Sequence, residues 1–157
     1  MSMESARAHL AKWGRDKDIM VSQASTATVA LAAQAFGVKP ERIAKTLALY
    51  RGDGAILVVA AGDAKLDNKK FKLCFECKPK MLSPEDTLIM TTHEPGGVCP
   101  FGVPEQVDVF LDNSLKRFES VFPACGTASS AIELAPVELE LYSQSKGWID
   151  VCKTGDE

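Results

Sequence analysis

The sequence predicts one domain of the α+β, or mixed α/β, class over residues 1–157. Three observations favour this class. Apolar residues recur at helical spacing near the start, two β-rich runs flank a glycine turn, and short strand and helix patterns alternate through the rest. The length suits a single hydrophobic core, and no apolar run approaches the roughly 20 residues that a membrane helix needs.

Two amphipathic helices are predicted near the start of the chain. The first covers about residues 4–13, and a short strand at residues 19–21 follows it. Ser25 or Thr26 can cap the second helix, because a side-chain oxygen at that position accepts a bond from a free helical N–H group. Gly37 ends this helix, since glycine readily adopts the left-handed conformation that closes a helix.

The runs "IAKTLALY" and "AILVVAA" flank Gly52-Asp53-Gly54 and predict a β-hairpin. The second run is apolar throughout and indicates a central strand that is covered on both faces. Alternation in the first run puts Lys45 in a row of apolar side chains. A lysine there needs a partner or a polar cleft; the alternative is a packed stem whose ammonium group reaches water.

The second half of the chain continues with short elements. Asp67 can cap a helix, and Ser83 can cap another. Strands are predicted at "VDVFL" and "ESVF", with a capped turn at Asp112 and a loop that opens at Gly126 and leads into "SAIEL". Pro136 begins a last helix, and "GWIDV" predicts an edge strand.

The segment "HEPGGVCPFG", residues 93–102, is a shaped loop. Gly96, Gly97 and Gly102 let the backbone approach a ligand and turn N–H groups toward an anion or an oxyanion. Pro100 stiffens the loop. The alternative is a connection that is merely rich in turn residues.

Two side chains of this loop are candidates for chemistry. His93 could act as a base or bind substrate, although a lone histidine near a turn is more often a hydrogen-bonding surface group. Cys99 could be a nucleophile if its pKa were lowered, and the alternative is a buried, inert thiol. No Ser/His/Asp arrangement is evident.

The five cysteines are an odd number in a chain whose start, "MSMESARAHLAKWGRDKD", does not resemble a secretory signal. Reduced thiols and a cytoplasmic location are therefore expected. Cys74 and Cys77 form one C-x-x-C, and a zinc or thiol-switch protein built on this pair is a minority alternative. We expect no metal and no cofactor.

Residues 65–80 hold six lysines and two acids, although the whole chain carries a net charge of −3. This stretch is interpreted as a surface that follows the phosphates of a nucleic acid, and the alternative is a solvated helix face. The candidate contacts in its first half are Lys65, Lys69, Lys70 and Lys72.

The motifs "RIAKTLALY", "AAGDAKLD", "HEPGGVCPFG", "VDVFLDNSL" and "CGTASSAIEL" occur in an order that resembles the YbaK-type aminoacyl-tRNA deacylases. This family is related to the editing domain of bacterial prolyl-tRNA synthetases. The resemblance covers about residues 22–139. It implies a mixed, mostly antiparallel, curved sheet of about six strands surrounded by helices.

The resemblance also implies a function. A free-standing hydrolase would remove a wrong amino acid (cysteine, alanine, serine or threonine) from a transfer RNA, most often tRNA(Pro), without any membrane or DNA partner. Lys45 matches the functional lysine of the family, and Gly126 matches the glycine of a second substrate-facing loop. The implied substrate-binding residues are Thr46, His93, Gly96, Gly97, Cys99, Pro100, Gly102 and Gly126.

Three positions depart from the family pattern. Cys99 stands where relatives often have serine, Ala131 stands where some have aspartate, and Thr46 stands where another branch has asparagine. The amino acid that is removed therefore stays open. The alternative function is a catalytically weak module of the same fold that binds tRNA or prolyl-tRNA synthetase. A monomer is the default expectation.

Overall fold

The computed structural model describes residues 2–154 and contains five α-helices in this part of the chain. They are α1 (Ser2–Ala11), α2 (Val29–Phe36), α3 (Asn68–Phe75), α4 (Pro84–Thr91) and α5 (Pro136–Ser143). Short 3-10 helices connect them at η1 (Asp16–Asp18), η2 (Pro40–Arg42), η3 (Pro95–Gly97) and η4 (Asn113–Arg117). None of the described helices is long and apolar enough to cross a membrane.

Five strands form the main sheet, in the order β6-β2-β3-β5-β8. They are β6 (Phe122–Pro123), β2 (Ile43–Arg51), β3 (Gly54–Ala61), β5 (Asp108–Asp112) and β8 (Trp148–Ile149). The long β2–β3 hairpin is antiparallel, whereas the shorter β2–β6, β3–β5 and β5–β8 pairs are parallel. Two small antiparallel sheets join β1 (Met20–Val21) to β7 (Ser130–Ala131) and β4 (Lys65–Leu66) to β9 (Cys152–Lys153).

The predicted mixed α/β class, with its mixed sheet and surrounding helices, is confirmed. The hairpin forms as expected, and β8 lies at the sheet edge. The main sheet has five strands where the sequence predicted about six, because residues 20–21 pair with residues 130–131 in a separate sheet. The strand predicted at "ESVF" is reduced to β6.

The helix boundaries depend on their capping residues. Asp67 and Ser83 cap α3 and α4 as predicted, because each side chain accepts a hydrogen bond from an N–H group of the first turn. Thr28 caps α2 by accepting from Leu31 N at 3.1 Å, so the predicted caps at residues 25–26 are wrong. Thr26 lies earlier in the loop and is nearly buried.

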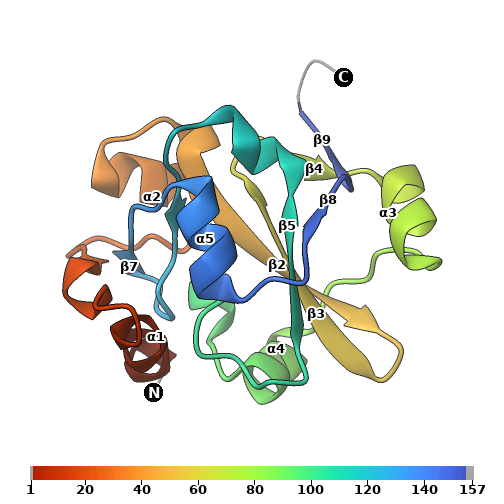
Figure 1. Ribbon diagram of the computed structural model, residues 1–157, viewed down its shortest axis with the longest axis horizontal. Helices are drawn as coiled ribbons and strands as arrows, with labels where there is room; N and C mark the ends of the chain where they lie inside the picture. Colours follow the sequence, from red (N-terminus) through yellow and green to blue (C-terminus); the bar gives the residue numbers. More distant parts are fainter. Residues whose placement is uncertain (1, 155–157) are drawn as a thin grey trace.

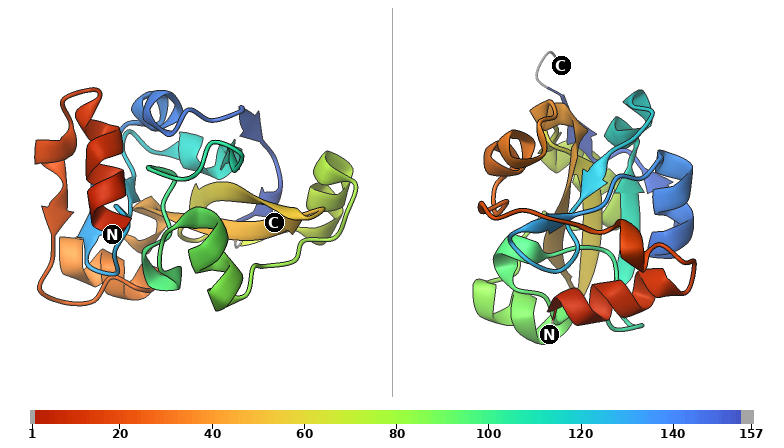
Figure 2. Two further views of the ribbon diagram at one scale, coloured as in Figure 1. Left: turned by 90° about the horizontal axis from the view of Figure 1, so that it is seen from below. Right: turned by 90° about the vertical axis from the view of Figure 1, so that its left-hand side faces the viewer.

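The helices lie on both faces of the main sheet. Figure 1 shows α5 in front of the sheet, and the turned views in Figure 2 show α5 on one face and α4 on the other. Strand β3 lies within the core, and every residue from Ala55 to Ala61 is buried. Helices α2 and α3 lie at opposite ends of the molecule (Figures 1 and 2).

The burial of β3 predicts the cost of a cavity. Leu57 is 0% exposed, whereas Leu73 on α3 is 86% exposed. We expect Leu57→Ala to lower the free energy of unfolding by about 2–5 kcal/mol, because it leaves a void in a packed core. The matched Leu73→Ala change should cost less than about 0.5 kcal/mol. Urea unfolding measures both, and equal losses would contradict this description of the core.

Candidate active site

A cavity of about 120 Å³ opens between α2, β2 and η3. Four stretches far apart in the sequence supply its lining: residues 26–32, 43–46, 95–98 and 122–131. Most of the lining side chains are small or apolar, and Lys45 is its charged member. The cavity therefore combines one cation with a space suited to a small, largely apolar group.

Lys45 lies on β2 opposite Ala60 of β3. Its Nζ donates to the carbonyl oxygen of Gly62 at 3.5 Å and to that of Ala64, just beyond the end of β3. Burial lowers the pKa of Lys45, and the neighbouring Cys152 and Asp63 oppose this shift. The prediction that Lys45 needs a partner is met by these backbone oxygens.

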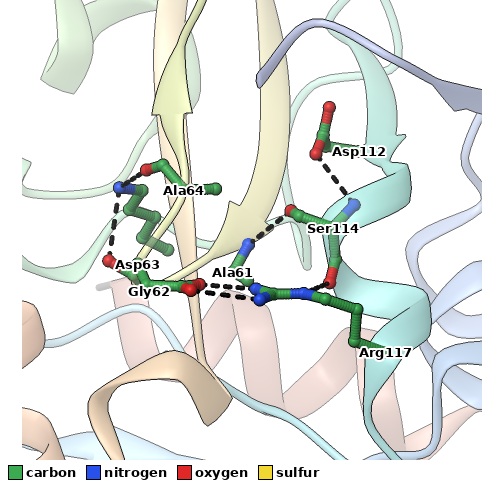
Figure 3. Close-up of polar contacts among 8 residues, drawn as sticks. Ala61, Gly62, Asp63, Ala64, Asp112, Ser114 and Arg117 are labelled. Carbon is green, nitrogen blue, oxygen red and sulfur yellow. Dashed lines mark hydrogen bonds and ion pairs between the residues drawn. The ribbon is translucent and has the colours of Figure 1, made fainter. Parts of the chain in front are cut away.

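Side chains of η4 form hydrogen bonds with the turn that holds Lys45 (Figure 3). Arg117 forms two hydrogen bonds with the Asp63 carboxylate, at 3.1 and 2.5 Å, and they lower the pKa of Asp63. Ser114 Oγ accepts from Ala61 N at 3.0 Å, while Ser114 N donates to Asp112 Oδ2 at 2.9 Å. The carbonyl groups around Lys45 are thus fixed by side chains more than 45 residues away in the sequence.

Two threonine hydroxyl groups at the cavity have no hydrogen-bond partner among the described residues. Thr26 and Thr46 both line it, and the Oγ1 atom of each is buried without a hydrogen-bond partner among the described residues. A buried hydroxyl without a partner costs free energy. Thr46 was expected at the site, but Thr26 was assigned to a helix cap, and its sequence context gave no other sign of this role.

The glycine loop, residues 93–102, reaches the cavity through Pro95, Gly96 and Val98. Gly97 is buried against the second loop, and a Cβ atom there would lie 2.5 Å from Thr127 Cα. Only glycine allows the two backbones to approach this closely. The two loops that were predicted to face the substrate are therefore packed directly against each other.

Several predicted site residues lie elsewhere in this loop. Cys99 and His93 are fully buried, and burial raises the pKa of the Cys99 thiol to about 12. Pro100 lines a different cavity, beside His9, and Gly102 packs against Ser5 of α1. None of these side chains is part of the lining around Lys45.

Gly126 is buried in the second loop with a φ of 89°, a conformation that other residues rarely adopt. Its backbone forms a hydrogen bond with the Cys99 thiol. This bond acts to lower the pKa of Cys99, whereas burial raises it. Gly126 is not in the cavity lining, but Ala124 and Ala131 on either side of the loop are. The loop shape therefore requires Gly126, while its neighbours meet the cavity.

The candidate tRNA-binding lysines do not line this cavity, although Lys65 directly follows Ala64, whose carbonyl oxygen accepts from Lys45. Lys69 and Lys72 are exposed on α3, and Lys65 is exposed on β4. Lys70 instead donates to Cys152 O at 2.9 Å and pairs with Asp150 at 3.2 Å. Since α3 and α2 lie at opposite ends of the molecule, a bound RNA would have to run along its length to meet both regions (Figure 1).

The C-x-x-C pair begins in α3 and ends just beyond it. Cys74 is exposed and Cys77 is partly buried. Within residues 2–154, the structure brings together no group of three or more His, Cys, Asp or Glu side chains that could hold a metal ion.

Comparison with known proteins now defines the class. A family model described as "Aminoacyl-tRNA editing domain" matches residues 23–141, which include all four stretches around the cavity. The chain is also 55% identical over 155 residues to "Uncharacterized protein YwhH" of Bacillus subtilis, with 98% of each chain covered. The chain belongs to the aminoacyl-tRNA editing domain family.

Two further relatives are more distant. Over 106 residues, 66% of this chain and 65% of the relative, the chain is 30% identical to an Enterococcus faecalis protein named "Putative Cys-tRNA(Pro)/Cys-tRNA(Cys) deacylase EbsC". The solved structure of "a putative trans-editing enzyme for prolyl tRNA synthetase" superposes with a TM-score of 0.86 at 27% identity, covering 97% of both chains. These likenesses confirm the resemblance to the YbaK type.

The contact between the two loops gives a testable consequence. Gly97→Ala would push a methyl group into the Thr127 backbone, so we expect it to lower the free energy of unfolding by about 1–3 kcal/mol. Gly54→Ala is the matched control, because its Cβ atom would lie 3.8 Å from the nearest atom outside its neighbours. That control should stay within about 1 kcal/mol of the parent. Thermal unfolding compares them, and equal stability would refute the tight contact.

Proposed function

We propose that residues 1–157 act as one free-standing aminoacyl-tRNA deacylase, which hydrolyses the ester of a mischarged tRNA. The proposed substrate is tRNA(Pro) that carries a small non-cognate amino acid, and the cytoplasm is the proposed location. Membership of the aminoacyl-tRNA editing domain family supports this proposal. The names of the two distant relatives are "Putative Cys-tRNA(Pro)/Cys-tRNA(Cys) deacylase EbsC" and "a putative trans-editing enzyme for prolyl tRNA synthetase", and tRNA(Pro) is the substrate that both support.

The observation that carries the proposal is Lys45 at the cavity. Its ammonium group has three donors, and two of them meet the carbonyl oxygens of Gly62 and Ala64. The third N–H group is available to a substrate oxygen. A cation held this way can orient the terminal ribose or phosphate and stabilise negative charge as the ester is attacked.

The reaction would not require a protein nucleophile. The Cys99 thiol is buried and its raised pKa keeps it protonated at neutral pH, and the His93 ring is enclosed within the loop. Water would instead attack the ester carbonyl. The backbone N–H group of Gly96, together with Lys45, would stabilise the oxyanion, since Pro95 has no N–H group and Gly97 N donates to Glu94 O at 2.8 Å.

The small size of the cavity is consistent with a second-sieve role. Ala27, Val29 and Ala131 leave space for a small amino-acid side chain. A second sieve is needed because one methylene is worth only about 1–3 kcal/mol in discrimination at a first binding site, and a pocket of this kind accepts small residues and excludes larger ones by contact. The choice among cysteine, alanine, serine and threonine is left to experiment.

We predict that Lys45→Ala and Lys45→Met both reduce deacylation by about 10²-fold or more, since each removes the positive charge. Lys45→Met retains most of the stem, so its free energy of unfolding should stay within about 1 kcal/mol of the parent. Lys17→Ala, at an exposed position in η1, is the control. The measurement is the loss of each ester from tRNA(Pro) charged with cysteine, alanine, serine, threonine or proline.

Selective loss of one non-cognate ester, absent in both Lys45 variants, would support the proposal and name the amino acid. Full activity in Lys45→Met would contradict the role of the ammonium group. If the parent protein removes none of the five esters faster than spontaneous hydrolysis, deacylation of tRNA(Pro) is refuted. Binding of tRNA without hydrolysis would then favour the alternative, a binding module of the same fold.

A further prediction concerns tRNA binding by the lysines of α3. Replacing exposed Lys69 and Lys72 by glutamate should weaken tRNA binding and reduce its salt dependence, because fewer counterions are released when the RNA binds. Lys70 is retained because it holds Asp150. Lys17→Glu tests the effect of charge alone. Binding titrations at several salt concentrations measure the slope, and an unchanged slope in the double variant would show that α3 is a solvated face.

A further inference from the structure

The two histidines of the chain hold opposite sides of one peptide group. The carbonyl oxygen of Phe101 contacts His93, and the N–H group of Gly102 contacts His9. Together they form the peptide unit at the end of the glycine loop. We propose that His9 and His93 clamp this unit and so position the loop for the deacylation proposed above, on which this inference rests.

The His93 side of the clamp lies within the loop itself. Its Nε2–H group donates to Phe101 O at 2.7 Å, which closes the segment from residue 93 to residue 101. A carbonyl oxygen can only accept, so Nε2 must carry the proton. The ring is 0% exposed, and Nδ1 is buried without a partner in the described chain. His93 is therefore a positioning residue.

The His9 side comes from α1, outside the residues 23–141 that the family model matches. Its Nδ1 accepts from Gly102 N at 3.0 Å, and its Nε2–H donates to Tyr142 O on α5 at 2.6 Å. The amide can only donate and the carbonyl can only accept. These two bonds therefore require a neutral ring with the proton on Nε2.

The backbone around Gly102 explains why the clamp fixes the loop. Gly102 has a φ of 71°, and a Cβ atom there would lie 2.6 Å from the Ser5 backbone. The loop end is thus pressed against α1, while Gly97 in the middle of the loop is pressed against Thr127. Between these two fixed points lies Val98, which lines the cavity. Fixing both points holds this part of the cavity wall in place.

The clamp has a defined response to acid. A proton on His9 Nδ1 would face the Gly102 N–H group. The hydrogen bond from Gly102 N to His9 Nδ1 would then be lost, and the two N–H groups would repel each other. The other charged groups around this ring are Lys12 on α1 and, across the shared cavity, Glu105, Asp108 and Lys146; Arg15 stacks on the ring of Tyr142. Burial, with a smaller contribution from Lys12, lowers the pKa of His9, and burial also lowers the pKa of His93.

The direction of the pH effect follows from these shifts. Both histidines take up protons more readily in the unfolded chain than in the folded protein. Above the unfolded pKa of about 6.5 they are neutral in both states, so they do not lower the free energy of unfolding there. Stability should fall as the pH drops below that value and should level off only below the folded pKa values. In the folded protein the loop itself should loosen only as the pH falls through these lowered pKa values, where the histidines take up protons.

Amide hydrogen exchange at Gly102, measured by NMR, tests the clamp without requiring turnover. His9→Phe keeps a ring against Trp13 and Phe101 but removes both hydrogen bonds, so Gly102 exchange should rise about tenfold. His9→Asn places an acceptor that does not titrate near the Nδ1 position, and it should restore most of the protection. Amides of β3 should be unchanged in both variants.

Deacylation assays then connect the clamp to the reaction. His9→Phe should lower kcat more than it raises KM, and the activity of His9→Asn relative to the parent should rise as the pH falls through the lowered pKa that His9 has in the folded protein. Unchanged Gly102 exchange in His9→Phe, or faster exchange at every amide including β3, would overturn the clamp. A loosened loop with unchanged kcat would overturn its role in the reaction. Loosening without any parent activity would overturn the proposed function and leave the clamp supported.

Discussion

The constraint on which the site depends is the placement of a lysine ammonium group at the end of a buried hairpin. An ammonium group in such a place loses hydration and needs fixed oxygen partners. The β2–β3 register brings Lys45 beside the turn after β3, and the carbonyl oxygens of Gly62 and Ala64 then meet it. The Arg117–Asp63 pair holds that turn, so the cation depends on contacts across the sheet.

The rest of the site is assembled by contacts between backbones. A Cβ atom on Gly62 would lie 1.9 Å from Pro40 O, which joins the end of β3 to the segment before β2. Gly97 against Thr127 joins the two loops, and Gly102 against Ser5 joins the first loop to α1. Each contact leaves no room for a side chain, and together they set the distance between the cation and the loops.

Local features were predictable from the sequence because their physical causes are local. The glycine turn predicts the hairpin, Asp67 and Ser83 predict helix starts, and the alternation around Lys45 predicts an inward cation. Long-range partners were not predictable. A glycine in a sequence shows that a Cβ atom is excluded but not by what, so the Gly102 contact with α1 could equally have been a ligand contact. Nothing near His9 in the sequence indicates that it meets residue 102.

The backbone contacts at the glycines and the side chains that line the cavity differ in how they can change during evolution. At Gly62 and Gly97 the nearest opposing atom belongs to backbone, so a change in a neighbouring side chain alone cannot make room for a larger residue. Ala27, Val29 and Ala131 line the cavity, and one larger or more polar residue at any of them would reshape the cavity while the backbone stayed in place. An ancestor with this architecture could therefore diversify in substrate preference by single steps, each compatible with a folded intermediate.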